Sequence, residues 1–286
     1  MKMNDRAVVA FLIPFASRRV KSKWEMACTH LRQTLKSIQN SISGNFRAVV
    51  AGHEAPDFDV RFDSRFCLLS VNHPITLHGD SAASRRLDKL AKIAAAWDYA
   101  KSKWNPKYVM KLDADDFISS RLVDWLGTAS GEAGYLIKHG WVWRSGSRHL
   151  IERTEYFDRV CASCLIIRSD LADQEGPFLT EAEGVRLDGA SSTFAATDQY
   201  SLVPGSGIST LLLNDTHQRY AAQFAYLGHK LSSVPFNAVV YRTGNPDSDS
   251  RTAGIARPTY TVRVVIGKIR RTRFITKSLR REFMLG

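Results

Sequence analysis

Two hydrophobic patterns alternate along the first 113 residues of the chain. Continuous apolar runs at 7–15, 46–52, 66–71 and 108–113 are typical of strands that are buried on both faces. Residues 24–38 and 84–103 instead have apolar side chains three or four positions apart, which predicts amphipathic helices. Strands that alternate with helices in this way predict an α/β fold with a mainly parallel central sheet and flanking helices.

The second half of the chain repeats these patterns less regularly. Further strands are predicted at 134–143 and 160–168, a helix at 217–228, and a strand that ends near residue 242. Trp141 and Trp143 share one face of their strand, where they either pack in the core or stack on a sugar ring. A polar stretch begins near residue 245, so we expect one domain over 1–245 and a tail over 246–286.

Three acids stand at the end of the fourth predicted strand: Asp113, Asp115 and Asp116. Ligands of α/β sheets bind at the carboxyl ends of strands, so the position predicts a site. Carboxylates this close repel one another unless a positive charge lies among them. Their hard oxygen atoms suit Mg²⁺ or Mn²⁺. The alternative is a solvated acidic turn ahead of a helix that starts near Ser119.

The positive charge of the chain is concentrated at its C-terminus. Residues 251–286 contain ten Lys or Arg residues and one acid, Glu282, in a chain with a net charge of +12. Residues 261–283 mix these charges with apolar side chains, which predicts either an amphipathic segment on an anionic membrane surface or a helix packed on the domain. Nucleic acid is not expected as a partner because the rest of the chain is nearly neutral and no binding motif is present.

Composition and short sequence features indicate where in the cell the protein is expected to work. Apolar residues make up 44% of the chain, but none of the apolar runs reaches about 18 residues, so no spanning helix is predicted. The N-terminus is not typical of a signal peptide. Cys161 and Cys164 have no second cysteine pair that would complete a zinc site, so they are predicted to be core residues. These features favour a cytoplasmic protein, peripheral at the inner membrane face if the tail binds lipid.

Three segments resemble one enzyme family in the order in which they occur. LRQTLKSIQNS (31–41), KYVMKLDADDF (107–117) and LNDTHQRYAAQFAYLGHKLSSVPFNAVVYR (213–242) are similar to segments of the GT-A nucleotide-sugar glycosyltransferases, above all the large inverting bacterial family. The resemblance covers about residues 7–245. It implies a Rossmann-like, nucleotide-sugar-binding half over 1–117 and an acceptor half over 118–245.

The resemblance also implies roles for acidic residues and for one histidine. Asp113 and Asp115 would bind Mn²⁺ or Mg²⁺ together with the donor diphosphate, and Asp116 would support them. Asp215 would be the catalytic base that deprotonates the acceptor hydroxyl, or else only the N-cap of the following helix. His217 would be a third metal ligand or a diphosphate contact, or else a surface residue of the first helical turn.

Other residues would contact the nucleotide. By the resemblance, Pro14 and Arg18 after the first strand line the nucleoside and phosphate pocket. Glu54 or Asp57, in the turn AGHEAPD, would replace the aspartate with which the family contacts the base. Arg85 or Lys89 would approach the diphosphate, and the alternative is that both lie on a solvated helix face.

The family resemblance implies a metal-dependent glycosyltransferase. It would move a sugar from a nucleotide diphosphate donor to a hydroxyl of a glycan or lipid-linked acceptor, in synthesis of bacterial surface polysaccharide or glycolipid, with inversion favoured. One competing hypothesis is a sugar-phosphate nucleotidyltransferase, and another is a non-catalytic glycan- or membrane-binding protein with a transferase-like fold.

Overall fold

The computed structural model describes most of the chain. The described residues are 6–20, 23–73, 82–130, 132–177, 179–181, 200–202, 209–214, 217, 219–244 and 270–286. None of the helices in these ranges is both long enough and apolar enough to cross a membrane.

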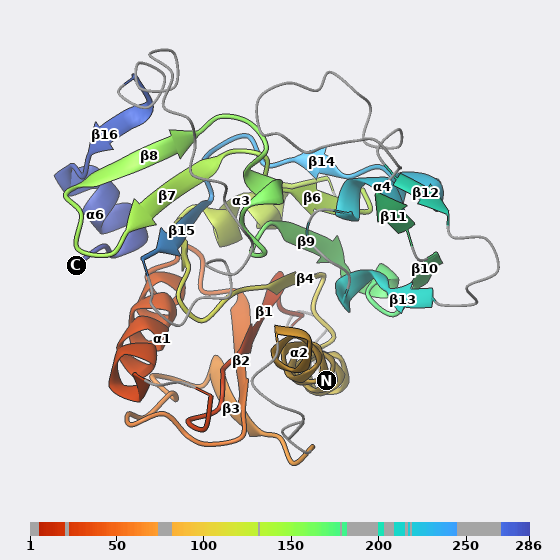
Figure 1. The fold of residues 1–286 in the computed structure, drawn as a ribbon, viewed down its shortest axis with the longest axis horizontal. Coiled ribbons are helices and arrows are strands. Elements are labelled where there is room, and N and C mark those ends of the chain that lie inside the picture. The colour runs from red at the N-terminus through yellow and green to blue at the C-terminus, as the bar shows by residue number, and fades with distance from the viewer. Residues whose placement is uncertain are drawn as a thin grey trace.

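A seven-stranded sheet forms the centre of the molecule, as Figure 1 shows. Its strands lie in the order β14-β6-β9-β4-β1-β2-β3, and only the two pairings made by β9 are antiparallel. The predicted α/β class with a mainly parallel central sheet is therefore confirmed. The strands are β1 (Val9–Pro14), β2 (Phe46–Gly52), β3 (Phe66–Ser70), β4 (Tyr108–Lys111), β6 (Gly134–Leu136), β9 (Leu165–Arg168) and β14 (Ser232–Ser233).

Two long helices cover this sheet. Helix α1 (Trp24–Gln39) and helix α2 (Ala82–Trp104) lie on either side of its β1–β2–β3 part (Figure 1). α1 buries Leu31, Leu35 and Ile38, the apolar positions of its predicted stripe. Because helices lie on both sides, residues Val9 to Ile13 of β1 are fully buried, which explains the continuous apolar run there.

A second sheet was not predicted. Its strands lie in the order β16-β8-β7-β15-β5, and only β7 and β15 pair in parallel. The single strand predicted at 134–143 is in fact two, β6 in the first sheet and β7 in the second. At this crossing a Cβ on Gly140 would lie 2.5 Å from the ring of Phe157, so only glycine fits. The strands are β5 (Phe117–Ile118), β7 (Gly140–Arg144), β8 (His149–Arg153), β15 (Val239–Thr243) and β16 (Thr272–Phe274).

Other predicted elements are shorter in the structure. The strand predicted at 160–168 begins only at Leu165, and the helix predicted at 217–228 is α4 (Tyr220–Tyr226). The remaining elements are α3 (Leu122–Thr128), α6 (Lys277–Phe283), β10 (Glu175–Pro177), β11 (Leu179–Glu181), β12 (Tyr200–Leu202), β13 (Ser209–Leu211), and the 3-10 helices η1 (Phe157–Arg159), η2 (Ser169–Leu171) and η4 (Leu212–Asn214).

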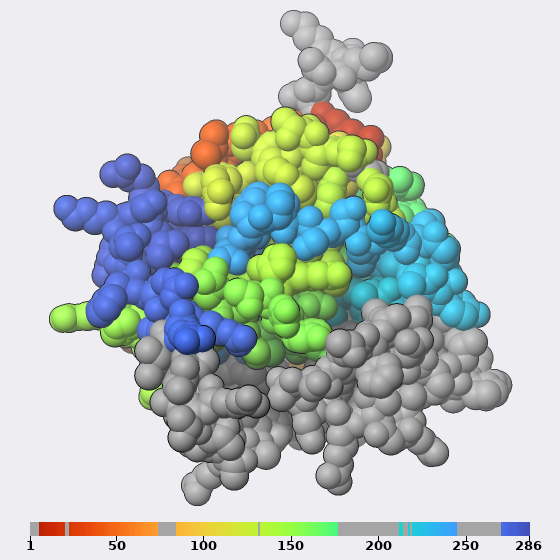
Figure 2. Space-filling model, turned by 90° about the horizontal axis from the view of Figure 1, so that it is seen from above, coloured from red at the N-terminus to blue at the C-terminus, as the bar shows by residue number. Residues whose placement is uncertain are grey.

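The C-terminal residues 270–286 pack on the domain. β16 pairs with β8, while Phe283 and Leu285 enter an apolar cluster with Phe117, Trp143 and Leu150. In Figure 2 these dark blue residues continue the surface of the body. Of the two alternatives for the tail, packing on the domain therefore holds for residues 270–286. The domain extends beyond the boundary that was predicted at residue 245. Residues 245–269 lie outside the described residues.

Candidate functional site

An ion pair joins Lys89 to Asp113 of the acidic cluster. β4 ends at Lys111, and Asp113 follows it at the carboxyl edge of the sheet. α2 packs along β1 and β2 and carries Lys89 to this edge, where its Nζ lies 2.6 Å from Asp113 Oδ1. Burial acts to raise the pKa of Asp113, but the charge and hydrogen bond of Lys89 outweigh it and hold that pKa below its usual value. Asp113 is therefore ionised at neutral pH.

Asp116 has a different environment from Asp113. Its side chain is fully buried, and its Oδ2 accepts hydrogen bonds from Ser163 Oγ at 2.7 Å and Cys161 Sγ at 3.4 Å. Its Oδ1 accepts one from the backbone N–H of Arg242 at 3.1 Å. Burial, together with the charges of Asp115 and Asp113, raises the pKa of Asp116 well above its usual value. Asp116 thus ties the end of β4 to β15 and to the turn at 161–163.

Two further cations lie near the carboxylates. Arg242 is 2% exposed, its guanidinium lies over the rings of Phe117 and Trp143, and it donates to Gln33 Oε1 at 2.6 Å. Burial lowers the pKa of Arg242 to about 10, while the charges of Asp115 and Asp116 oppose that shift. Lys111 is also buried, over the ring of Tyr220. Lys89, Lys111 and Arg242 together offset much of the repulsion among the acids.

His217 lies close to this cluster. Its Nε2 is 3.1 Å from the carbonyl oxygen of Arg159, which can only accept, so Nε2 carries the proton and only Nδ1 is left for a ligand. Burial lowers the pKa of His217, so the ring is neutral at pH 7. Within the described residues, Asp113, Asp115 and His217 do not form a group of three with all ligand atoms inside 4.8 Å. The role of His217 as a metal ligand therefore stays a prediction.

The residues predicted to contact the nucleotide gather after β1 and β2. Pro14 is the last residue of β1. Both oxygens of Glu54 are engaged: Oε1 accepts from Ser17 Oγ at 2.8 Å and Oε2 from the backbone N–H of Arg18 at 3.2 Å. Glu54 therefore shapes the loop after β1, while Asp57 is exposed.

The other predicted contacts lie on this loop, on α2 or outside the described residues. The guanidinium of Arg18 lies over the ring of Trp24 at 5.7 Å. Arg85 lies one turn before Lys89 on α2, and it is Lys89 that reaches Asp113. Asp215, the predicted catalytic base, lies outside the described residues, directly after η4.

Sequence patterns did not reveal the partners of Asp116. Ser163 and Cys161 were assigned to a buried strand, whereas they form the turn that donates to this carboxylate. The available signal was a Ser and a Cys immediately before an apolar strand, which does not by itself indicate a carboxylate contact. Cys161 and Cys164 are fully buried free thiols, as predicted.

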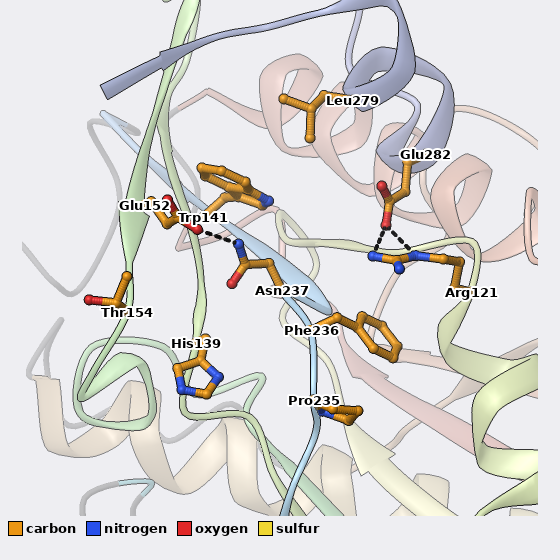
Figure 3. Close-up of a pocket in the computed structure, with 10 residues that line it drawn as sticks. All are labelled: Arg121, His139, Trp141, Glu152, Thr154, Pro235, Phe236, Asn237, Leu279 and Glu282. Atoms are coloured by element: carbon orange, nitrogen blue, oxygen red, sulfur yellow. Dashed lines mark hydrogen bonds and ion pairs between the residues drawn. The ribbon is translucent and has the colours of Figure 1, made fainter. Parts of the chain in front are cut away.

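A cavity of about 360 Å³ lies elsewhere, between α6 and the second sheet. Figure 3 shows Trp141 and Phe236 on its wall, with polar side chains that pair with each other. Asn237 Nδ2 donates to Glu152 Oε1 at 3.1 Å, and Arg121 pairs with Glu282 at 3.0 Å. Asn237 precedes β15 and Arg242 lies near its end, so the cavity is at the opposite end of that strand from Asp116. It is not part of the acidic site.

Comparisons with known proteins give only distant structural likenesses. No protein-family model and no curated protein sequence matches the chain. A crystal structure of TarS from S. aureus, residues 1–349, is 13% identical with a TM-score of 0.44 and covers 82% of this chain and 60% of its own. A longer TarS structure is 12% identical with a TM-score of 0.43, covering 84% and 37%. The chain thus spans 60% or less of these TarS structures, and likenesses this distant transfer no activity to it.

Proposed function

We propose that this chain is a glycosyltransferase that uses a nucleotide diphosphate sugar as donor. The observation that carries the proposal is the pairing of Lys89 with an ionised Asp113 at the carboxyl end of β4, beside Asp115. Carboxyl ends of strands are where α/β sheets bind ligands. The family resemblance of the segments around residues 31–41, 107–117 and 213–242 supports the same function.

The carboxylates at this edge fit a divalent ion. Asp113 is ionised and its side chain is 25% exposed, and Asp115 is half-buried, so hard oxygen atoms are accessible to solvent. In the proposal Asp113 and Asp115 hold Mg²⁺ or Mn²⁺, with His217 Nδ1 as a further contact. The ion supplies Lewis-acid stabilisation of the charge that develops on the leaving diphosphate.

The chain's own residues then bind and orient the substrates. Lys89, at present on Asp113 Oδ1, carries a positive charge that can also pair with a diphosphate oxygen. The loop after β1, fixed by Glu54, offers backbone groups to the nucleoside, with Pro14 and Arg18 on it. Arg85 and Asp57 are the further donor contacts in this proposal.

In the transfer step an acceptor hydroxyl oxygen forms a bond to the anomeric carbon of the sugar. The bond from that carbon to the diphosphate oxygen breaks, and the nucleoside diphosphate leaves with the electron pair. Asp215 takes the hydroxyl proton, and a single displacement of this kind inverts the anomeric carbon. The acceptor is a hydroxyl of a glycan or of a lipid-linked sugar, and the setting is surface glycan or glycolipid synthesis on the cytoplasmic side of a bacterial membrane.

Thermal unfolding tests this proposal. Nucleotide sugars are screened with and without Mn²⁺, on the wild type and on the double variant Asp113→Ala/Asp115→Ala. Binding at 100 times the Kd adds about 2.7 kcal/mol, which raises Tm by several degrees in a chain of this size. We expect such a rise with one nucleotide diphosphate sugar, dependent on Mn²⁺ and absent in the double variant.

An exposed acid gives the matched control. Asp124→Ala, on the surface of α3, should keep the full response. Stabilisation by a nucleoside triphosphate with a sugar phosphate would instead indicate a nucleotidyltransferase. If no nucleotide shifts Tm, both enzyme assignments fail and a non-catalytic binding protein remains.

A further inference from the structure

A second group of potential ligands lies at the same edge of the sheet, outside the acidic cluster. Nε2 of His53 is 2.8 Å from Asp88 Oδ1, and Nε2 of His73 is 3.0 Å from the same oxygen. The two imidazole rings meet edge to face with their centroids 4.7 Å apart. Within the described residues, this is the one group of three His, Cys, Asp or Glu side chains with all ligand atoms inside 4.8 Å.

The topology explains why three residues far apart in sequence meet. His53 directly follows β2, and His73 comes shortly after β3, the parallel neighbour of β2. Parallel neighbours end at the same edge of a sheet, so both histidines lie there. Asp88 comes from α2, which packs along β2. The side chains are 10%, 28% and 13% exposed in the order His53, His73 and Asp88, so the group is sheltered but reachable.

The atoms already converge at a spacing that a metal ion needs. Metal bonds of about 2.0–2.1 Å place neighbouring ligand atoms about 2.9–3.4 Å apart in octahedral or tetrahedral geometry. The two nitrogens lie 2.8 and 3.0 Å from the carboxylate oxygen. In the structure both nitrogens donate to Asp88. A shift of each ring proton from Nε2 to Nδ1 frees a lone pair on each nitrogen, beside the carboxylate oxygen that both nitrogens face.

Lys92 fixes the orientation of the carboxylate. Its Nζ lies 2.6 Å from Asp88 Oδ2, one turn along α2, and its side chain is 1% exposed. It therefore holds the far oxygen and leaves Oδ1 to the histidines. Groups that orient a ligand in this way are usual around metal ions.

We propose that His53, His73 and Asp88 bind one divalent transition-metal ion of the zinc class. Two imidazoles and one carboxylate are a ligand set for Zn²⁺, Co²⁺, Ni²⁺ or Fe²⁺ rather than for Mg²⁺, which takes oxygen ligands. Three protein ligands leave coordination positions open to water or to a bound molecule. The ion would join the loops after β2 and β3 to α2. Its ligand on α2, Asp88, directly precedes Lys89 in the chain.

Cobalt is the probe because its bound form absorbs visible light. Full-length protein without a histidine tag is stripped with a chelator and titrated with Co²⁺, and Zn²⁺ is titrated by calorimetry. We expect one equivalent of Co²⁺ to produce a visible absorption band that Zn²⁺ abolishes and that Mg²⁺ does not affect. His73→Ala should weaken binding by more than about 100-fold, because even loss of an orienting group costs 10–100-fold.

Several variants distinguish a metal site at this position from metal bound elsewhere on the chain. His73 is the most exposed of the three ligands, so its variant should fold, and circular dichroism and Tm verify this; His53→Gln is the second variant. His149→Ala, a partly exposed histidine outside the group, is the matched control and should bind as wild type.

The acidic site is tested in parallel. Asp113→Ala/Asp115→Ala should keep the cobalt band even where it loses nucleotide binding, so the two proposals can fail independently. An absent band, or a band that is unchanged in both histidine variants, would show that the cluster is only hydrogen-bonded and would overturn the proposal.

Discussion

Neighbouring acids at the end of β4 have different environments. Asp113 faces Lys89 at a partly exposed edge and is ionised, whereas Asp116 is fully buried and accepts hydrogen bonds from Ser163, Cys161 and the backbone of Arg242. The same residue type is therefore accessible to solvent and to a ligand in one position, and supports the fold internally in the other. What differs is access to water and the number of buried donors.

Asp116→Ala should destabilise the fold. The change leaves the Ser163 hydroxyl and the Arg242 backbone N–H buried without their acceptor, and each such group costs about 1–3 kcal/mol. We expect the free energy of unfolding from urea titration to fall by about 2–4 kcal/mol. Asp59→Ala removes an exposed acid and should change it by less than about 0.5 kcal/mol. Equal effects of the two variants would refute the supporting role of Asp116.

The ion pair of Lys89 and Asp113 predicts a pH dependence. The pKa of Asp113 is lowered in the folded state, so the pair contributes fully above the unfolded value of about 3.9 and its contribution is lost as pH falls below it. Lys89→Met removes the pair, and the pKa of Asp113 then rises because burial is unopposed by this partner. Between pH 5 and pH 3 the urea midpoint of the wild type should therefore fall more than that of the variant.

An exposed ion pair provides the comparison for this measurement. Lys101 pairs with Asp173, and their side chains are 54% and 44% exposed. Lys101→Met should follow the wild-type pH profile, because exposed pairs contribute little. If Lys89→Met also follows that profile, Asp113 is not held ionised by Lys89.

At the scale of elements, the second sheet is built from distant parts of the chain. β5 follows the acidic cluster, β15 carries Arg242, and β16 comes from the C-terminus. α6 packs against this sheet through Phe283, and the carbonyl oxygens of Arg281 and Glu282 accept hydrogen bonds from Asn40 and Ser120. The C-terminal helix is therefore part of the core that supports the site.

Phe283→Ala should show that α6 contributes to stability. Truncation of a fully buried phenylalanine costs about 3–5 kcal/mol, through lost burial and the cavity left behind. Phe274→Ala is the matched control because that ring is 72% exposed, so it should cost less than about 0.5 kcal/mol. Urea unfolding of the two variants measures the difference. Similar small losses would mean that α6 is dispensable for folding.

At the scale of the whole molecule, the surface of the C-terminal element is strongly basic. Arg270, Arg271, Arg273, Lys277, Arg280 and Arg281 are all exposed. Although α6 packs on the domain through Phe283, its charged side faces solvent. A lipid-linked acceptor would lie at a membrane, and anionic lipid surfaces attract such charges at about 1 kcal/mol each.

Vesicle sedimentation tests this surface. We expect the protein to bind vesicles of phosphatidylcholine with phosphatidylserine, not phosphatidylcholine alone, and to bind less as salt increases. Lys277→Gln/Arg280→Gln/Arg281→Gln should weaken binding by about 100-fold, given about 1 kcal/mol for each of the three charges. The matched variant Lys101→Gln/Lys103→Gln neutralises exposed lysines on α2 and should bind normally. Equal binding by both variants would exclude the α6 surface as the contact.

The sequence by itself determined the first half of the fold and the position of the acidic cluster. Buried parallel strands must be apolar on both faces and amphipathic helices must repeat every 3.6 residues, so β1 to β4, α1 and α2 are local in origin. The acids after β4 then lie at the carboxyl edge because the strand ends there. The family resemblance named Arg85 or Lys89 as a diphosphate contact, with a solvated helix face as the alternative, and in the structure Lys89 lies beside Asp113.

Only the tertiary structure decided which partners meet. The short strands of the second sheet pair with strands that are far away in the sequence. The hydrophobic periodicity within a strand does not specify which distant strand becomes its partner. Ser163 and Arg242 become partners of Asp116 only where a turn and a strand cross. His53, His73 and Asp88 are inconspicuous in sequence because they lie 20 and 15 residues apart, and they converge because two parallel strands end, and helix α2 begins, at the same edge of the sheet.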